Sequence, residues 1–253
     1  MSAMSATPTE KAVISRHDAS IDARVVSPRP PLGARPTHRS MLWRVVAGVE
    51  VALATAAVVL DLFIPALVVV ALTVVSLVVR RQGLGSLGLR RVAHPMRMVV
   101  QALGLAAGWT LVNFVVTKPV LEHVSGQRQD MSAFEALQGN VGLLLVLLVL
   151  SWLLGAFAEE LAFRGFVLTR MTQLFGAGVL SVPLAVILSS VIFGFLHTEY
   201  GLIGVAVSAI DAVFYSLVRY HYRSLWAAIC THGFIDTIGM VSVFIAGPVY
   251  GLW

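Results

Sequence analysis

The sequence has little charge and almost no cysteine for a chain of its length. Only 12% of its 253 residues are charged and 58% are hydrophobic, whereas soluble domains carry about 25% charged residues. A single globular core of this size cannot bury such an excess of apolar side chains, because too much of the chain stays at the surface. These proportions exclude a soluble enzyme and a disordered scaffold, and they predict that lipid surrounds most of the chain.

Other absences narrow the class further. Cys230 is the single cysteine, which excludes an intramolecular disulfide and a zinc site built from cysteines. We find no internal repeat. The net charge of +5 comes with no nucleic-acid motif, since the arginines flank apolar segments. We therefore expect membrane lipid, and no nucleic acid, as a partner, and the sequence leaves the oligomeric state open.

Residues 1–40 differ in composition from the rest. They hold six of the 18 basic residues, three of the 13 acidic residues and five of the ten prolines. They contain no apolar run long enough for the core of a signal peptide, so we expect no cleaved leader. We predict a basic, proline-rich, disordered tail that fixes the topology and can also rest on anionic lipid.

The remaining chain is a series of apolar segments. A helix needs about 20 apolar residues to cross the hydrocarbon layer. The run Val45 to Val79 is too long for one span and contains turn residues from Asp61 to Pro65, which predicts a hairpin of two short helices. Further spans are predicted at 99–117, 141–158 (with a helical pattern on to 170), 179–197, 202–219 and 225–245. The fold class is thus an all-α polytopic transmembrane bundle of about seven or eight spans around a polar cavity.

The distribution of arginine predicts the orientation. Five arginines and no acidic residue lie between positions 80 and 97, which marks a cytoplasmic loop by the positive-inside rule. Arg219 and Arg223, between the last two spans, agree with this assignment. The mixed charges of residues 118–139 then face the other side, and the N-terminus is cytoplasmic.

Charged groups inside a membrane are costly and tend to mark function. We interpret the single acids Glu50, Asp61 and Asp211 as locally paired or snorkelling residues. The pair Glu159-Glu160 differs, because adjacent carboxylates in a low dielectric disfavour each other's ionisation, which suits acid/base work. On a helix Glu160 can pair with Arg164 four residues on, while Glu159 points about 100° away and is left free for chemistry. The alternative is a buried ion pair that only joins helices.

Two further segments carry polar residues on apolar helices. His197 ends the string Phe193-Gly194-Phe195-Leu196-His197, and His232 stands four residues before Asp236, on the same helix face. Asp236 can point with His232 into one cavity, or can fix the tautomer of its ring. Local hydrogen bonds alone are the alternative. Together with the acidic pair, these groups provide what hydrolysis needs, an activated water and charge stabilisation. Two histidines and a carboxylate also form a ligand set for catalytic zinc.

Three motifs occur in order: Glu-Glu-x-x-x-Arg (Glu159 to Arg164), Phe-x-x-x-His (Phe193 to His197) and His-x-x-x-Asn/Asp (His232 to Asp236). This order on successive apolar segments resembles the CAAX protease and bacteriocin-processing family (CPBP, or Abi, family). The resemblance covers about residues 150–240 and extends to the string Glu-Glu-Leu-x-Phe-Arg-Gly ending at Gly165. Its known members are multi-span intramembrane endopeptidases, including enzymes that trim prenylated CAAX proteins.

The resemblance implies a role for each residue. Glu159 would be the general base, supported by Glu160 and Arg164. His197 would hold the water or a metal, and His232 with Asp236 would stabilise the oxyanion or complete a metal site. A divalent metal such as zinc would be held by Glu159, His197 and His232; a glutamate-type protease is the alternative.

Asp236 departs from the pattern, since asparagine is common at its position. An ionised aspartate cannot donate a hydrogen bond to an oxyanion. Asp236 is therefore protonated, or it orients His232, or it binds a metal, and of these we favour the orienting role.

The resemblance implies an endopeptidase of peptide or lipidated protein substrates, in a bacterial plasma membrane. We expect a tail (1–40), accessory transmembrane helices (41–137) and a catalytic transmembrane core (138–253). A non-catalytic scaffold or immunity protein of the same fold, and a proton-coupled transporter, are the alternatives; a transporter often shows paired repeats. His197 ends its predicted span far from the predicted depth of Glu159. The two residues can therefore reach one site only if the chain breaks or re-enters near Gly176 to Pro183, or if a span boundary differs from the prediction.

Overall fold

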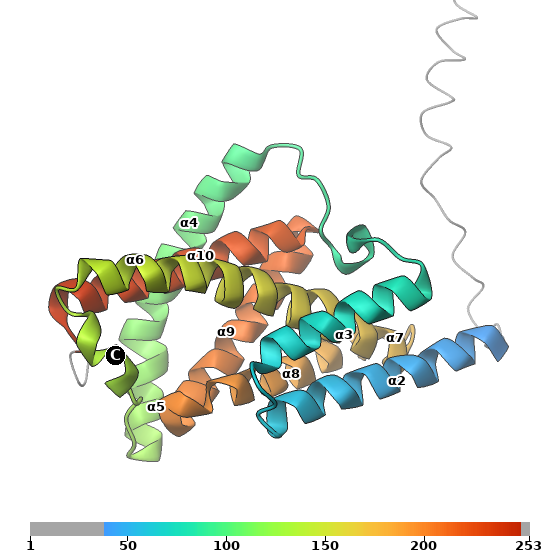
Figure 1. Cartoon of the computed structure of the whole chain (residues 1–253), viewed down its shortest axis with the longest axis horizontal. Coiled ribbons are helices and arrows are strands. Elements are labelled where there is room, and N and C mark those ends of the chain that lie inside the picture. The colour runs from blue at the N-terminus through green and yellow to red at the C-terminus, as the bar shows by residue number, and fades with distance from the viewer. Residues whose placement is uncertain (1–37, 249–253) are drawn as a thin grey trace, which may run out of the picture. The chain divides into compact units, whose positions relative to one another are not determined.

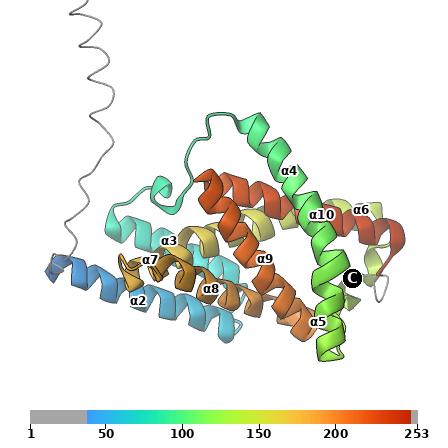
Figure 2. The ribbon, with the colours of Figure 1, turned by 180° about the vertical axis from the view of Figure 1, so that it is seen from behind.

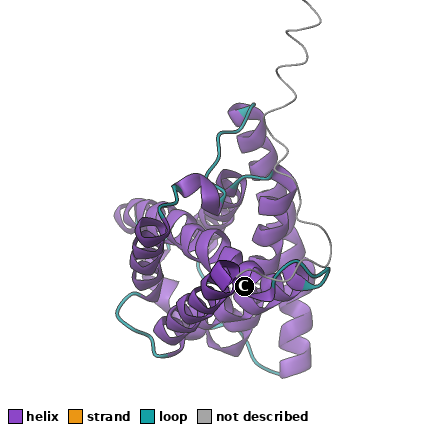
Figure 3. Ribbon diagram, turned by 90° about the vertical axis from the view of Figure 1, so that its right-hand side faces the viewer, coloured by secondary structure: helices purple, strands orange, loops and turns teal. Residues whose placement is uncertain are grey.

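The structure is a computed structural model that describes residues 38–248. The chain divides into two units, Met1–Met41 and Leu42–Trp253. Of the first, only His38–Met41 is described, as the first turn of a helix, so most of the predicted tail lies outside the described residues. In the described part of the second unit, helices are joined by short loops and no strand occurs (Figure 3). The predicted all-α fold is thereby confirmed.

Every predicted span corresponds to a helix (Figure 1). The α-helices are α2 (His38–Val59), α3 (Pro65–Arg80), α4 (Pro95–Val112), α5 (Lys118–Ser125), α6 (Val141–Leu150), α7 (Leu168–Phe175), α8 (Ser181–Gly194), α9 (Gly201–Tyr222) and α10 (Leu225–Ala246). Short 3₁₀ turns are η2 (Leu84–Leu87), η4 (Ser132–Leu137) and η6 (Phe195–Tyr200), and π-helical segments are η3 (Asn113–Thr117) and η5 (Ser151–Val167).

Five of these helical stretches are long and apolar enough to cross a membrane. They are Ser40–Val59, Pro95–Ser125, Val141–Phe175, Ser181–Tyr222 and Leu225–Ala246, and Pro65–Arg80 is a shorter apolar helix. Ser181–Tyr222 contains two predicted spans, since α8 and α9 are joined through η6. The predicted number of spans is therefore consistent with the structure.

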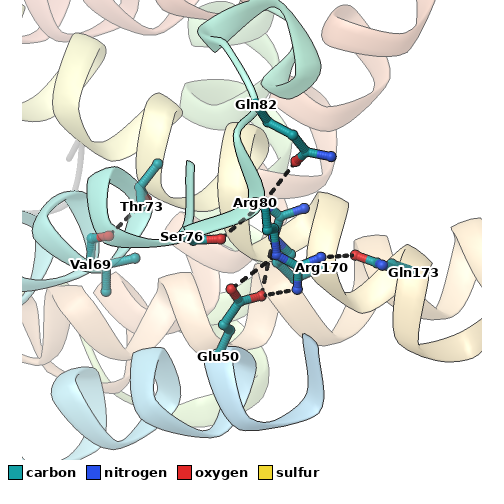
Figure 4. Close-up of polar contacts among 8 residues, drawn as sticks. All are labelled: Glu50, Val69, Thr73, Ser76, Arg80, Gln82, Arg170 and Gln173. Atoms are coloured by element: carbon teal, nitrogen blue, oxygen red, sulfur yellow. Dashed lines mark hydrogen bonds and ion pairs between the residues drawn. The ribbon is translucent and has the colours of Figure 1, made fainter. Parts of the chain in front are cut away.

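The predicted hairpin between Val45 and Val79 consists of α2 and α3. Asp61 and Phe63 adopt positive φ angles of 47° and 56° in the turn, and Pro65 opens α3, where its missing N–H is not needed. Glu50 of α2 bridges two arginines: its Oε2 lies 2.6 Å from Nη2 of Arg80 and 3.2 Å from Nε of Arg170 on α7 (Figure 4). This cluster ties the hairpin to the rest of the unit, so Glu50 is locally paired, as predicted.

The third predicted span ends later than expected. Residues 118–125 form α5 and continue the helix of α4 and η3 to Ser125, although their charges suggested a loop beginning at Lys118. The helix passes Pro119 because proline is tolerated in the first turn of a helical segment, where its missing N–H costs little, and the preceding π turn already interrupts the α-helical hydrogen bonds.

The helical stretch Val141–Phe175 is continuous but changes its winding. Asn140 caps its start by accepting a hydrogen bond from the Leu143 N–H, 3.0 Å away. The backbone then follows a π-helix through η5 and returns to an α-helix in α7. This stretch packs beside α10 and α3, and α4 crosses α10 on the opposite side (Figures 1 and 2). Periodicity predicts an α-helix here, and π winding is a feature that such a pattern does not reveal.

A close helix pair carries His197. α8 and α9 pack against each other through Gly194, where a Cβ atom would lie only 2.6 Å from the carbonyl oxygen of Val205. Between them the chain leaves helical geometry at His197, whose φ and ψ are −116° and 32°. The predicted break near Gly176 to Pro183 is also present, because Gly176 ends α7 at a φ of 82° and α8 begins at Ser181.

Candidate active site

A cavity of about 340 Å³ lies among η5, η6, α9, α10 and the α4–η3 helix. Four of the six predicted site residues line it: Glu159, His197, His232 and Asp236. The other two, Glu160 and Arg164, are buried, with exposed fractions of 0% and 2%. The three motifs, far apart in the sequence, therefore meet at one place in the fold.

Glu160 connects two of the motifs. Its Oε1 lies 3.0 Å from Nη1 of Arg164 and accepts a hydrogen bond from Nδ1 of His232 at 2.9 Å. The pairing of Glu160 with Arg164, predicted from their spacing, is thus present in η5. The second contact reaches α10, so that the carboxylate of Glu160 holds the imidazole of His232 from behind the cavity.

Aromatic rings enclose the Arg164 guanidinium. Its Cζ lies 3.9 Å from the ring centroid of Phe193 and 5.0 Å from that of Tyr215. Tyr215 also stacks on His232, with centroids 4.6 Å apart and an interplanar angle of 15°. Stacked cations and rings favour a fixed side-chain arrangement. Phe193 belongs to a predicted motif, whereas Tyr215 carries no sign in the sequence of its contact with His232.

Asp236 lies on the cavity side of His232. Its Oδ2 accepts a hydrogen bond from the Ser151 hydroxyl at 2.6 Å and lies 3.6 Å from Nε2 of His232. The second distance allows an electrostatic contact but exceeds hydrogen-bond length. Gly155 leaves room for this carboxylate, because a Cβ there would come within 3.2 Å of Oδ2. Ser151, which the sequence analysis did not single out, therefore completes the surroundings of Asp236.

Glu159 and His197 both line the cavity, but of the two side chains only the His197 ring is held by a hydrogen bond within residues 38–248. Oε2 of Glu159 is buried and has no hydrogen-bond partner among the described residues. Nδ1 of His197 lies 3.3 Å from the carbonyl oxygen of Phe193, which can only accept, so Nδ1 carries the hydrogen and Nε2 is the acceptor in the neutral ring. The four-residue spacing of the Phe-x-x-x-His motif produces this bond.

The predicted metal ligands do not form a ligand set as they are placed. Within residues 38–248, no three His, Cys, Asp or Glu side chains are grouped so that they could hold one metal ion. His232 directs Nδ1 to Glu160 and Nε2 towards Asp236. The metal stays a prediction.

The wall formed by α4, η3 and α9 is also polar. Asp211 accepts two hydrogen bonds at Oδ1, from Nε1 of Trp109 and from Nδ2 of Asn113, both at 2.7 Å. Asp211 is thus locally paired, as predicted, but Asp211 and Asn113 also line the cavity. Both tryptophan and asparagine are uncharged, so the search for intramembrane charges missed them.

The site and the helices define an integral membrane protein with a cavity lined by ionisable side chains. Residues 141–238 match the family model described as "Type II CAAX prenyl endopeptidase Rce1-like". The predicted family resemblance is confirmed for this part of the chain. The match includes all six predicted site residues and excludes Trp109 and Asn113. No curated protein and no solved structure matches the chain.

Proposed function

We propose that this protein is an intramembrane endopeptidase that hydrolyses a peptide bond in a membrane-associated substrate. The observation that carries the proposal is the meeting of Glu159, His197, His232 and Asp236 on one cavity, with Glu160 and Arg164 packed behind them. Packing alone does not require this many ionisable groups on separate apolar helices, whereas hydrolysis requires a base and charge stabilisation. The family match supports the same reaction class.

Glu159 acts as the general base in this proposal. Its carboxylate takes a proton from a water molecule in the cavity, and the resulting hydroxide attacks the scissile carbonyl carbon. Its buried Oε2, which has no partner among the described residues, suits this proton transfer. When the C–N bond breaks, Glu159 returns the proton to the leaving amine, so the net reaction consumes one water.

The two histidines have different functions in this proposal, one towards the attacking water and one towards the oxyanion. Nε2 of His197 accepts a hydrogen bond from the attacking water, because Nδ1 is used by the Phe193 carbonyl. His232, held between the carboxylates of Glu160 and Asp236, acts as an imidazolium and donates from Nε2 to the oxyanion of the tetrahedral intermediate. Asp236 orients this ring, and Ser151 fixes Asp236 in turn.

For the substrate, we propose a lipidated or membrane-tethered peptide, with prenylated CAAX-type proteins as one group. For the location, we propose the bacterial plasma membrane. For the orientation, we propose a cytoplasmic N-terminus, because the five arginines between positions 80 and 97 mark a cytoplasmic loop. The match of residues 141–238 to the Rce1-like family model supports the substrate class.

The test is a cleavage assay on the purified, lipid-reconstituted protein. A farnesylated peptide and a membrane-anchored peptide without a prenyl group serve as substrates, and Glu159→Ala and His197→Ala are compared with Asp61→Asn, an exposed acid of the α2–α3 turn. We expect cleavage by the wild type and Asp61→Asn and its loss in the other two. Undiminished cleavage by both site variants would overturn the assignment. Substrate uptake into proteoliposomes without a proteolytic product would instead identify a transporter.

A further inference from the structure

Asn113 presents an unsatisfied acceptor beside the proposed catalytic groups. It is 6% exposed and lines the same cavity as Glu159 and His232, but it lies on η3, outside the region that matches the family model. The bond from Nδ2 to Asp211 fixes the orientation of its amide. Its Oδ1 is buried and has no hydrogen-bond partner among the described residues.

The surroundings of Asn113 hold the amide in this position. Asp211 Oδ1 accepts from Asn113 and from Trp109, and the Trp109 ring stacks on Phe214 at a centroid distance of 4.1 Å. A buried acceptor without a donor is costly, because it has lost its bonds to water and gained none. Asn113 also begins a π turn, and such turns are frequent at functional sites. The wall is therefore arranged to receive a donor from outside residues 38–248.

The charges nearby restrict the kind of donor. Lys118 lines the same wall and interacts electrostatically with Asp211, so the wall already contains its own cation. A second cation from the substrate would be repelled by Lys118. A neutral N–H group satisfies the Asn113 oxygen without adding charge, and the main chain of a peptide supplies such groups at every residue except proline.

We propose that Asn113 Oδ1 binds a main-chain N–H of the substrate peptide close to the scissile bond. This inference rests on the proposed endopeptidase function and adds a substrate-binding residue to it. Asn113 is the binding residue, and Asp211 is a positioning residue that holds its amide through the hydrogen bond from Nδ2. The subsite selects an extended peptide main chain and does not read a particular side chain.

The test combines N-methylated peptides with a variant that lacks the acceptor. Each peptide carries one N-methyl group at a successive position, which removes one N–H donor. Binding is measured with the Glu159→Gln variant, which should cleave the peptide too slowly to disturb the measurement. KM is measured with the wild type. At one position we expect methylation to weaken binding about three- to tenfold, the range of a single hydrogen bond. Asn113→Leu should bind the unmethylated peptide more weakly by a similar factor. Methylation at that one position should not weaken its binding further.

Matched variants separate binding from a structural role. Gln101→Leu also replaces a side-chain amide by leucine, at an exposed position of α4 whose amide accepts a hydrogen bond from Tyr222, and should keep the wild-type response to methylation. Asp211→Asn should reduce that response, since it weakens the hold on the amide, while kcat changes less than KM. If the losses from methylation and from Asn113→Leu multiply at every position, the inference is overturned. If Asn113→Leu does not fold, the wild type and Asp211→Asn are compared instead. The inference is overturned if N-methylation weakens peptide binding equally in both.

Failure of the proposed function would look different. In that case the wild type would bind or cleave none of the peptides, including the unmethylated one. A wild type that cleaves the unmethylated peptide and is insensitive to methylation at every position preserves the function and removes the subsite.

Discussion

Oε1 of Glu160 lies 2.9 Å from Nδ1 of His232, although the two residues are 72 positions apart in the sequence. The same oxygen pairs with Arg164, whose guanidinium packs on Phe193. The carboxylate of Glu160, in the first motif, therefore contacts His232 of the third motif directly. It is connected to Phe193 of the second motif through Arg164. The second acid of the pair has a supporting role distinct from that of Glu159.

Replacement of Glu160 should destabilise the protein. Glu160→Ala leaves Arg164 and His232 buried without their shared carboxylate, and loss of one partner of a buried pair costs about 3–5 kcal/mol. We expect a clear fall in the unfolding temperature in detergent, with loss of cleavage. The double variant Glu160→Leu with Arg164→Met should recover part of the stability, because it removes both charges. An unchanged unfolding temperature in Glu160→Ala would contradict the structural role.

Glu159→Gln should have the opposite pattern. The change preserves the size of the side chain but removes the proton acceptor, and general-base catalysis contributes about 10²- to 10⁴-fold. We expect kcat to fall by that range while the unfolding temperature stays close to that of the wild type. Steady-state kinetics and thermal unfolding on the same preparation provide both readouts. A variant with wild-type kcat would exclude Glu159 as the base.

Asp236→Asn should retain activity. The amide can accept the Ser151 hydroxyl through Oδ1 and can donate through Nδ2 towards the oxyanion, and the resembling family commonly has asparagine at this position. Asp236→Leu can do neither and should lose most of its activity. Ser151→Ala should reduce kcat about tenfold or less, because one hydrogen bond is lost. Equal activity in Asp236→Leu and Asp236→Asn would argue against a polar role for this residue.

The Glu50 cluster should affect stability and leave the chemistry intact. Glu50→Gln removes the charge that Arg80 and Arg170 share (Figure 4). Because Glu50 is partly exposed, we expect a loss on the order of 2–3 kcal/mol, below the cost for a fully buried pair. kcat per folded molecule should not change. Asp61→Asn, on the exposed turn of the same hairpin, is the control and should leave both quantities unchanged.

Hydropathy and motif order predict much of this molecule. Long apolar runs dictate helices because lipid leaves no other partner for the backbone, and charges inside those runs are few enough to single out Glu159, His197 and His232. The i,i+4 spacing also predicts the contact of Glu160 with Arg164. These inferences depend on local patterns, which a sequence displays directly.

The remaining features depend on contacts between distant segments. Tyr215 stacks on His232 and Ser151 binds Asp236 through the packing of separate helices, and neither residue type is unusual in a membrane helix. Asn113 is uncharged, so the scarcity of charge in the apolar runs does not single it out, although it lines the cavity. The extension of the third helix to Ser125 is hidden in the sequence, because the charged residues after Thr117 resemble a loop. Such features require the three-dimensional arrangement.

The π-helical winding of Ser151–Val167 makes the site sensitive to the length of the chain before it. An α-helix turns by about 100° per residue, so removing one residue between Val141 and Gly155 rotates everything that follows relative to the helix start. Glu160 would then leave His232, and Glu159 would leave the cavity, unless the wide turns tightened to absorb the change. Insertions and deletions in this stretch are therefore restricted more strongly than substitutions on its lipid-facing side.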